Sequence, residues 1–196
     1  DSALESINSG IPNLVSISGT LIGSCMKYLT NPYIKEKGFA CTSAILDQLV
    51  SDDEMIIYHA HPALVAGFSD ALIGFPEEFP ADQLDAFKGI ITEMIESDFD
   101  KNDENKLEFY YRLYKSILTA LKNIALYQLK LNPEMNDEGF YKWMKNFVFG
   151  NFINKKIERN EMYMDKKLLE EFIEFINTIV KEYKTKFNIF CNIYFF

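Results

Sequence analysis

The chain has few of the residues around which compact sites are usually built. Its 196 residues include only 3 cysteines, 2 histidines and 1 tryptophan. Cys25, Cys41 and Cys191 are too few and too far apart for a secreted disulfide framework, and no Cys-x-x-Cys pair suggests zinc. This cysteine usage favours a reducing, intracellular compartment. The chain begins with Asp1 rather than Met and has no signal-like leader, which indicates a processed or trimmed product.

Positive charge and long apolar runs are also scarce. The 20 Lys and Arg residues face 29 Asp and Glu residues, so the formal net charge is -9. Nucleic-acid binding needs clustered Lys and Arg to neutralise phosphates, and we therefore expect no nucleic-acid partner. Polar or charged residues interrupt every apolar stretch well before the roughly 20 residues that a transmembrane helix needs. We expect no membrane-spanning segment.

Motifs for nucleophilic catalysis are absent. The run from Ser16 to Ser24 is rich in small residues, but it lacks the Gly-x-Ser-x-Gly pattern of a nucleophile elbow. Gly19 and Gly23, four positions apart, instead favour close packing of one helix against another. A thiol dyad of Cys41 with His59 has nothing in the sequence that would orient it. The sequence therefore indicates no catalytic constellation, and an enzyme is the lesser expectation.

Any mechanism that needs an imidazole must use one of the two histidines. His59 and His61 alternate as metal ligands do on an extended segment, and Asp52, Asp53 and Glu54 lie nearby in the sequence. Two imidazoles do not complete a zinc site, and no motif places a third ligand. The alternative is a pair at a helix end whose rings cap carbonyl groups before Pro62.

Apolar residues at spacings of three and four predict an all-α protein, an irregular bundle of seven to nine helices in a single domain covering residues 1–196. An early helix turns a set of side chains inward: Leu14, Ser18, Leu21, Ile22, Cys25, Met26 and Leu29. Gly38 then opens a shorter helix whose inward residues are Ile45, Leu46, Leu49 and Val50.

Later helices are delimited by caps and prolines. Ser51 and Glu54 have the spacing of a capping box, so a helix is expected to begin there and to restart at Pro62. The proline-rich residues 75–80 are expected to join two sub-layers, 1–75 and 81–196. Further helices are predicted near 82–97, 107–131, 140–148 and 168–183. Their inward faces are expected to include Leu84, Phe87 and Ile91 in the first, Ile117 and Leu121 in the second, and Ile173 in the last.

Oxygen-bearing side chains alternate in the loop between two predicted helices, residues 98–111. Asp100, Asn102 and Glu104 can turn toward one centre, the carbonyl group of Lys106 can join them, and Glu108 lies two positions further on. A hard cation such as calcium takes six to eight oxygen ligands, so this loop is the candidate metal site.

This helix-loop-helix, about residues 87–118, resembles one unit of the EF-hand family. The resemblance implies calcium as the cation, with Asp100 at the first ligand position and apolar residues such as Phe99 in the entering helix. The twelfth position, where the family has a bidentate carboxylate, is Tyr111, and the glycine of the sixth position is Asn105. The loss of two oxygens implies calcium binding that is greatly weakened or abolished. A partner loop at 134–145 has Gly139 in the turn but Lys145 at its closing position.

The last ten residues form an almost uncharged, strand-like segment of high β propensity. Its candidate interaction residues are Phe187, Ile189, Phe190, Ile193, Tyr194, Phe195 and Phe196. Such a segment must be covered, either by the core of this domain or by another subunit or assembly.

The sequence holds 17 Phe and 11 Tyr, more aromatic surface than a small helical bundle needs inside. Either the core is unusually aromatic, or part of this surface recognises a partner or an apolar ligand. We therefore expect a non-enzymatic regulatory or protein-interaction module that binds a protein partner or forms a homo-oligomer and that a cation modulates. The alternative is a helical carrier that encloses an apolar small molecule such as a fatty acid.

Overall fold

The computed structural model describes residues 2–26, 28, 32–74, 79–97, 106–131, 142 and 166–182. These residues contain seven α-helices and no strand, which confirms the predicted all-α class. The helices are α1 (Ser2–Ile7), α2 (Pro12–Met26), α3 (Pro32–Leu49), α4 (Glu54–Gly74), α5 (Ala81–Glu96), α6 (Leu107–Leu131) and α8 (Lys166–Glu182). The helix predicted at 140–148 and the strand-like segment at 187–196 lie outside the described residues.

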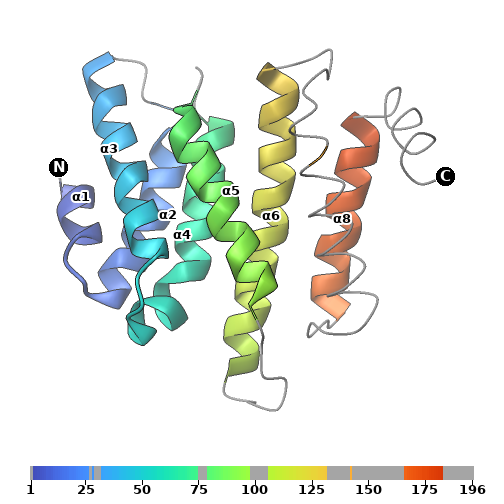
Figure 1. Cartoon of the computed structure of the whole chain (residues 1–196), viewed down its shortest axis with the longest axis horizontal. Coiled ribbons are helices and arrows are strands. Elements are labelled where there is room, and N and C mark those ends of the chain that lie inside the picture. The colour runs from blue at the N-terminus through green and yellow to red at the C-terminus, as the bar shows by residue number, and fades with distance from the viewer. Residues whose placement is uncertain are drawn as a thin grey trace.

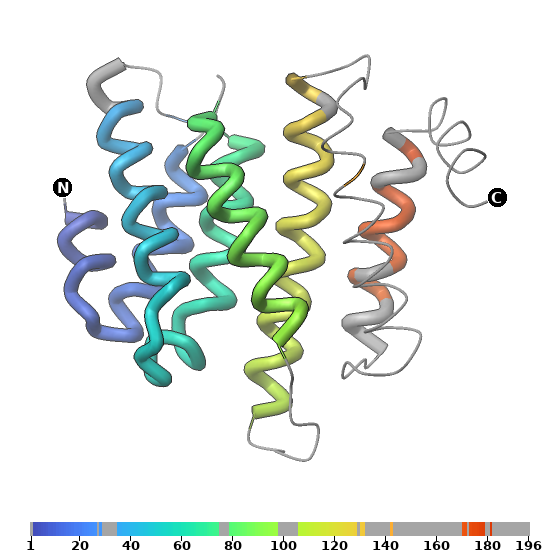
Figure 2. Tube along the Cα trace, viewed as in Figure 1, coloured from blue at the N-terminus to red at the C-terminus, as the bar shows by residue number. Residues whose placement is uncertain are grey.

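The helices form two layers whose members alternate along the chain. In the first, here called the even layer, α2, α4, α6 and α8 each pack against the next. α1, α3 and α5 form the odd layer, which lies in front of α2 and α4 in the view of Figure 1. α2 and α8 lie at opposite ends of the even layer, as the Cα trace in Figure 2 shows. Helices from before and after residues 75–80 meet in both layers, α4 with α6 and α3 with α5.

Aromatic side chains fill the space between the layers. Phe68 of α4 stacks on Phe87 of α5 with ring centroids 4.2 Å apart. Phe79 meets Phe68 edge-on at 5.4 Å, and its backbone N–H donates to the buried hydroxyl of Tyr127. Because a buried phenol needs a polar partner, this bond makes Tyr127 compatible with the core. Several aromatic side chains of the described residues are thus part of the core.

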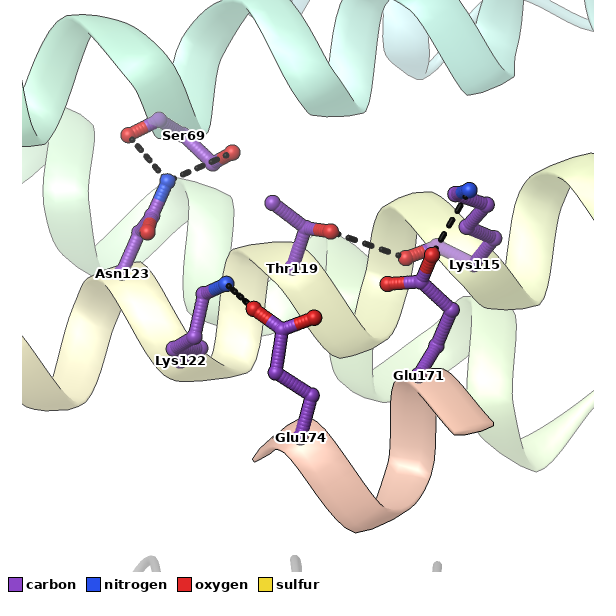
Figure 3. A network of polar contacts seen from close by, with 7 residues as sticks. All are labelled: Ser69, Lys115, Thr119, Lys122, Asn123, Glu171 and Glu174. Carbon is purple, nitrogen blue, oxygen red and sulfur yellow. Dashed lines mark hydrogen bonds and ion pairs between the residues drawn. The ribbon is translucent and has the colours of Figure 1, made fainter. Parts of the chain in front are cut away.

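Polar contacts connect α6 to both of its neighbours in the even layer (Figure 3). The buried Asn123 donates from Nδ2 to the carbonyl oxygen of Ser69 on α4 at 3.2 Å and to its hydroxyl at 3.3 Å. Two ion pairs reach α8: Lys115 with Glu171 at 2.7 Å and Lys122 with Glu174 at 3.2 Å. The ion pairs are partly exposed and contribute at most about 1 kcal/mol each. The buried amide of Asn123 contributes more to stability, because its hydrogen bonds to α4 are shielded from water.

α3 differs from its prediction at both ends. It begins at Pro32, so Gly38 lies inside the helix and does not open it. Ile45, Leu46 and Leu49 are buried as predicted, but Val50 is 66% exposed. Proline is well suited to the first turn of a helix, and the buried face ends with the helix at Leu49.

α4 also differs from its prediction, because it runs through Pro62 without a restart. Pro62 is buried, and the packing of α4 between α2 and α6 outweighs the roughly 3 kcal/mol that an interior proline costs. The helix does begin near Ser51, but its cap is Asp53, whose Oδ1 accepts the backbone N–H of Met55 at 2.8 Å. Ser51 instead accepts the N–H of Asp53 at 3.2 Å.

Candidate functional site

Glycines hold α2 unusually close to α4. A Cβ atom added to Gly23 would lie 2.5 Å from the carbonyl oxygen of Gly67 and 2.8 Å from its Cα. A Cβ on Gly19 would lie 2.9 Å from Leu64 Cδ2, and one on Gly67 would meet the backbone of Gly19. The expectation that Gly19 and Gly23 allow close helix packing is therefore confirmed. Their contact decides which side of α2 faces the core.

The rotation of α2 corrects its predicted inner face. Ser18, Ile22 and Met26 are buried as expected, together with Val15 and the two glycines. Leu14, Leu21 and Cys25 were expected inside but are exposed, because the glycine side allows the closest approach to α4. Small residues face the core, and large aliphatic residues face outward.

These outward residues form a surface that we call the α2 stripe. It consists of Ile11 (53% exposed), Leu14 (41%), Ile17 (64%), Leu21 (51%) and Tyr28 (71%). Steps of three and four positions place Leu14, Ile17 and Leu21 along one side of the helix, and Ile11 and Tyr28 lie just outside its two ends. Single exposed apolar residues are ordinary, but a continuous apolar stripe indicates a binding surface.

Two hydroxyl groups beside the α2 stripe, those of Thr20 and Ser24, find hydrogen-bond acceptors within the helix itself. No residue from Pro12 to Met26 is charged. The hydroxyl of Thr20 donates to the carbonyl oxygen of Ser16 at 3.3 Å, and that of Ser24 donates to the carbonyl of Thr20 at 3.0 Å. Covering this face would therefore desolvate no charge on α2 and would leave these hydroxyls hydrogen-bonded.

A shallow cavity of about 200 Å³ continues the α2 stripe sideways, between α1, α2 and α3. Leu21 and Cys25 belong to its wall as well as to the exposed side of α2, and Gly38 and Cys41 of α3 form the opposite wall. Lys37 also lines it. A cavity of about 150 Å³ is already enough to hold benzene, so one apolar side chain or small ligand fits here.

The two cysteines of the cavity are free thiols. Burial raises the pKa of Cys41, and the positive charge of Lys37 only partly opposes this effect. A raised pKa keeps the sulfur as an unreactive thiol at neutral pH. The residues lining the cavity include no histidine, so the wall contains no base that would complete a thiol dyad.

The histidines do not form the alternating pair that the sequence suggested. Both lie on α4, where residues two positions apart do not face each other. His59 is exposed, whereas His61 is buried and its Nε2 lies 3.3 Å from the carbonyl oxygen of Gln48 at the end of α3. Burial lowers the pKa of His61, so the neutral ring donates its Nε2 proton to that carbonyl. His61 thus caps the end of α3, whereas the alternative interpretation expected both rings to cap carbonyl groups at a helix end before Pro62; α4 does not end there, and His59 is exposed.

Most of the candidate cation loop lies outside the described residues, including Asp100, Asn102 and Glu104. Of its remaining candidates, Lys106 places its ammonium group 5.2 Å from the centre of the Tyr58 ring, and Glu108 is exposed in the first turn of α6. In the part of the chain that the structure describes, no three His, Cys, Asp or Glu residues are grouped so that they could hold a metal ion. The interaction residues at 187–196 also lie outside this part.

No family model, no curated protein and no solved structure matches this chain. What is established is therefore its class, an all-α protein of two helical layers. None of the seven described helices is both long enough and apolar enough to span a membrane.

The α2 stripe was missed because sequence patterns place the largest aliphatic residues inside. One available signal was the pair Gly19 and Gly23, which predicts the side of closest packing. Another was the absence of charge from a 15-residue helix, because no charged residue marks which of its sides faces solvent. Together they would have placed Leu14, Ile17 and Leu21 outside.

Proposed function

We propose that this chain is a non-enzymatic protein-interaction module whose docking surface is the α2 stripe with its adjoining cavity. The observation that carries the proposal is the exposure of Ile17 and Leu21 on a charge-free helix, beside the hydroxyl groups of Thr20 and Ser24, which already donate to carbonyl groups of that helix. A surface of this kind loses little on desolvation and gains from apolar contact.

The shape of the surface favours a helical ligand. Apolar anchors at Leu14, Ile17 and Leu21 are spaced as in surfaces that bind one side of an amphipathic helix. The even layer uses the same type of contact three times, between α2 and α4, α4 and α6, and α6 and α8. A helix laid on the α2 stripe would repeat that contact at the end of the layer.

A matched pair of variants tests the proposal. A photo-crosslinking residue at Ile17 would identify the partner in native-source extract, and purified partner would then be titrated calorimetrically. Burying the 64% of Ile17 that is exposed is worth about 1–2 kcal/mol, so Ile17→Glu should weaken binding at least about tenfold. Val50→Glu changes a side chain that is 66% exposed but lies outside the stripe, and it should leave the affinity unchanged. Equal affinities for the two variants would rule out the α2 stripe as the docking surface.

The cavity favours one second candidate function, the carriage of an apolar small molecule. Its wall combines the aliphatic side chains of Ala3, Leu21 and Met26 with two thiols, and Lys37 could pair with an acidic head group. Native mass spectrometry of the purified chain would show a bound molecule as added mass. A bare chain from several expression hosts would count against carriage and would leave the docking proposal intact.

Cation modulation is a separate proposal, which rests on the oxygen pattern at 100–108. Calorimetric titration with calcium and with magnesium tests it. The absence of heat and of any stability change at millimolar cation would remove it.

A further inference from the structure

We infer that the partner of the α2 stripe is a second copy of this chain, and that two α2 helices pack stripe to stripe across a twofold axis. This inference rests on the proposed docking function and names the partner for it.

The arrangement of the even layer supports a helix as the missing neighbour. α4 packs between α2 and α6, and α6 packs between α4 and α8. In the described part of the chain, α2 meets α4 on its glycine side, while its opposite side carries the exposed stripe. An α2 helix from a second copy would pack against this exposed side of α2. The even layers of the two copies would then form one continuous layer.

The stripe is also suited to pairing with itself. A twofold interface brings the same patch of both copies together, so the patch must complement its own copy. Leu14 and Ile17 precede Leu21 by seven and four positions on α2, so an axis at Leu21 would place these two side chains of each copy on either side of it. The steps of three and four from Leu14 through Ile17 to Leu21 are those of a helix-helix seam.

Charge favours a second copy at this surface over a strongly charged partner. Each chain carries a net charge of -9, so two copies repel each other over most approaches. Between Pro12 and Met26 there is no charge, and contact there brings no like charges of α2 together. A strongly basic partner would instead be recognised through carboxylates, which this helix lacks.

The size of the seam sets the expected strength. α2 has 15 residues and is therefore about 22 Å long. A standard interface uses about 20–30 residues from each side, more than this stripe and its cavity offer. We therefore expect a reversible dimer with a Kd on the order of micromolar and not an obligate one.

Sedimentation velocity over a concentration series tests the inference on the whole chain. The unmodified chain and Val50→Glu should shift from monomer to dimer together, whereas Ile17→Glu should raise the dimer Kd at least about tenfold. Circular dichroism and unfolding curves confirm that each variant is folded. A chain that stays monomeric at several hundred micromolar overturns the inference, and so does a dimer that Ile17→Glu leaves intact.

Cysteine cross-linking locates the contact independently. In a background with all three native cysteines replaced by serine, Leu21→Cys should form a disulfide-linked dimer under mild oxidation, because the axis places it opposite its copy. Ile173→Cys on α8 is 49% exposed and serves as the control, which should stay monomeric. Equal cross-linking of both variants contradicts a seam at α2.

The outcomes separate the two proposals. If the chain is monomeric but Ile17→Glu abolishes binding of a different protein, the dimer inference fails and the docking function stands. If Ile17→Glu changes neither self-association nor partner binding, both fail.

Discussion

Gly23→Ala is the substitution that most directly tests how α2 packs. The added Cβ would lie 2.5 Å from the carbonyl oxygen of Gly67 and 2.8 Å from its Cα, where ordinary contact begins at 3.4 Å. The opposing atoms belong to the backbone of α4, which cannot rotate away as a side chain can. One helix must therefore move by about 1 Å, which disturbs the core on both sides of α2.

The expected magnitude follows from two opposing terms. Overpacking a core costs about 1–3 kcal/mol, and an obstacle made of backbone favours the upper end. Alanine regains about 1 kcal/mol of helix propensity over glycine. We expect Gly23→Ala to lower the free energy of unfolding by about 2 kcal/mol, or the melting temperature by about 4–8 °C.

Two further glycines supply the controls. Gly89 on the exposed side of α5 has nothing within 4 Å of its added Cβ, so Gly89→Ala should stabilise the protein by about 0.5–1 kcal/mol. The Cβ of Gly19→Ala would meet Leu64 Cδ2 at 2.9 Å, and the end of that side chain can shift. Its cost should therefore fall between the other two.

Urea unfolding followed by circular dichroism measures all three variants against the unmodified chain. The predicted order of stability is Gly89→Ala, unmodified chain, Gly19→Ala and Gly23→Ala. A Gly23→Ala protein as stable as the unmodified chain would refute the close contact of α2 with α4. A Gly89→Ala protein that loses as much as Gly23→Ala would show that the loss does not arise at the contact.

Three predictions concern buried or capping polar groups. Burial lowers the pKa of His61 below its usual 6.5, so on acidification the unfolded chain takes up the proton first. The free energy of unfolding should therefore fall as the pH drops from about 6.5 toward the lowered pKa; His61→Gln should reduce this slope, and an equal reduction in His59→Gln would contradict the assignment. Asn123→Ala removes the two hydrogen bonds that the buried amide donates to Ser69 of α4 and should cost about 1–3 kcal/mol in urea unfolding, so a change below about 0.5 kcal/mol would exclude a structural role for these hydrogen bonds. Asp53→Ala removes the cap of α4 and should cost about 0.5–2 kcal/mol, whereas Asp52→Ala, at an exposed neighbour, should be nearly neutral; the reverse order would relocate the cap.

The spacing of apolar residues correctly predicted the helices that bury their largest apolar side chains. In α5, the spacing of Leu84, Phe87 and Ile91 predicted both the helix and its buried face, and all three side chains are at most 5% exposed. In α6, the same holds for Ile117 and Leu121. Burial of apolar side chains dominates the stability of such helices, and the spacing of these residues can be read directly from the sequence.

The pattern failed where backbone contact or long-range packing outweighed side-chain size. Pro62 predicted a restart of α4, but neighbours on both sides hold this helix continuous. Ile173 was expected inside α8, yet it is 49% exposed while Phe175 is buried at 1%. The local sequence predicts neither the continuity of α4 nor the exposure of Ile173, because the packing contacts that decide them come from residues distant in sequence.

By itself, then, the sequence determined an acidic, all-helical chain without a basic patch, a long apolar run or a nucleophile motif. It also marked Gly19 and Gly23 as a place where two helices could meet closely. Only the tertiary structure decided that the other helix is α4 and that Gly67 is its contact point. That pairing turned Ile17 and Leu21 outward, since a helix held by its glycine face must present its opposite face to solvent or to a partner.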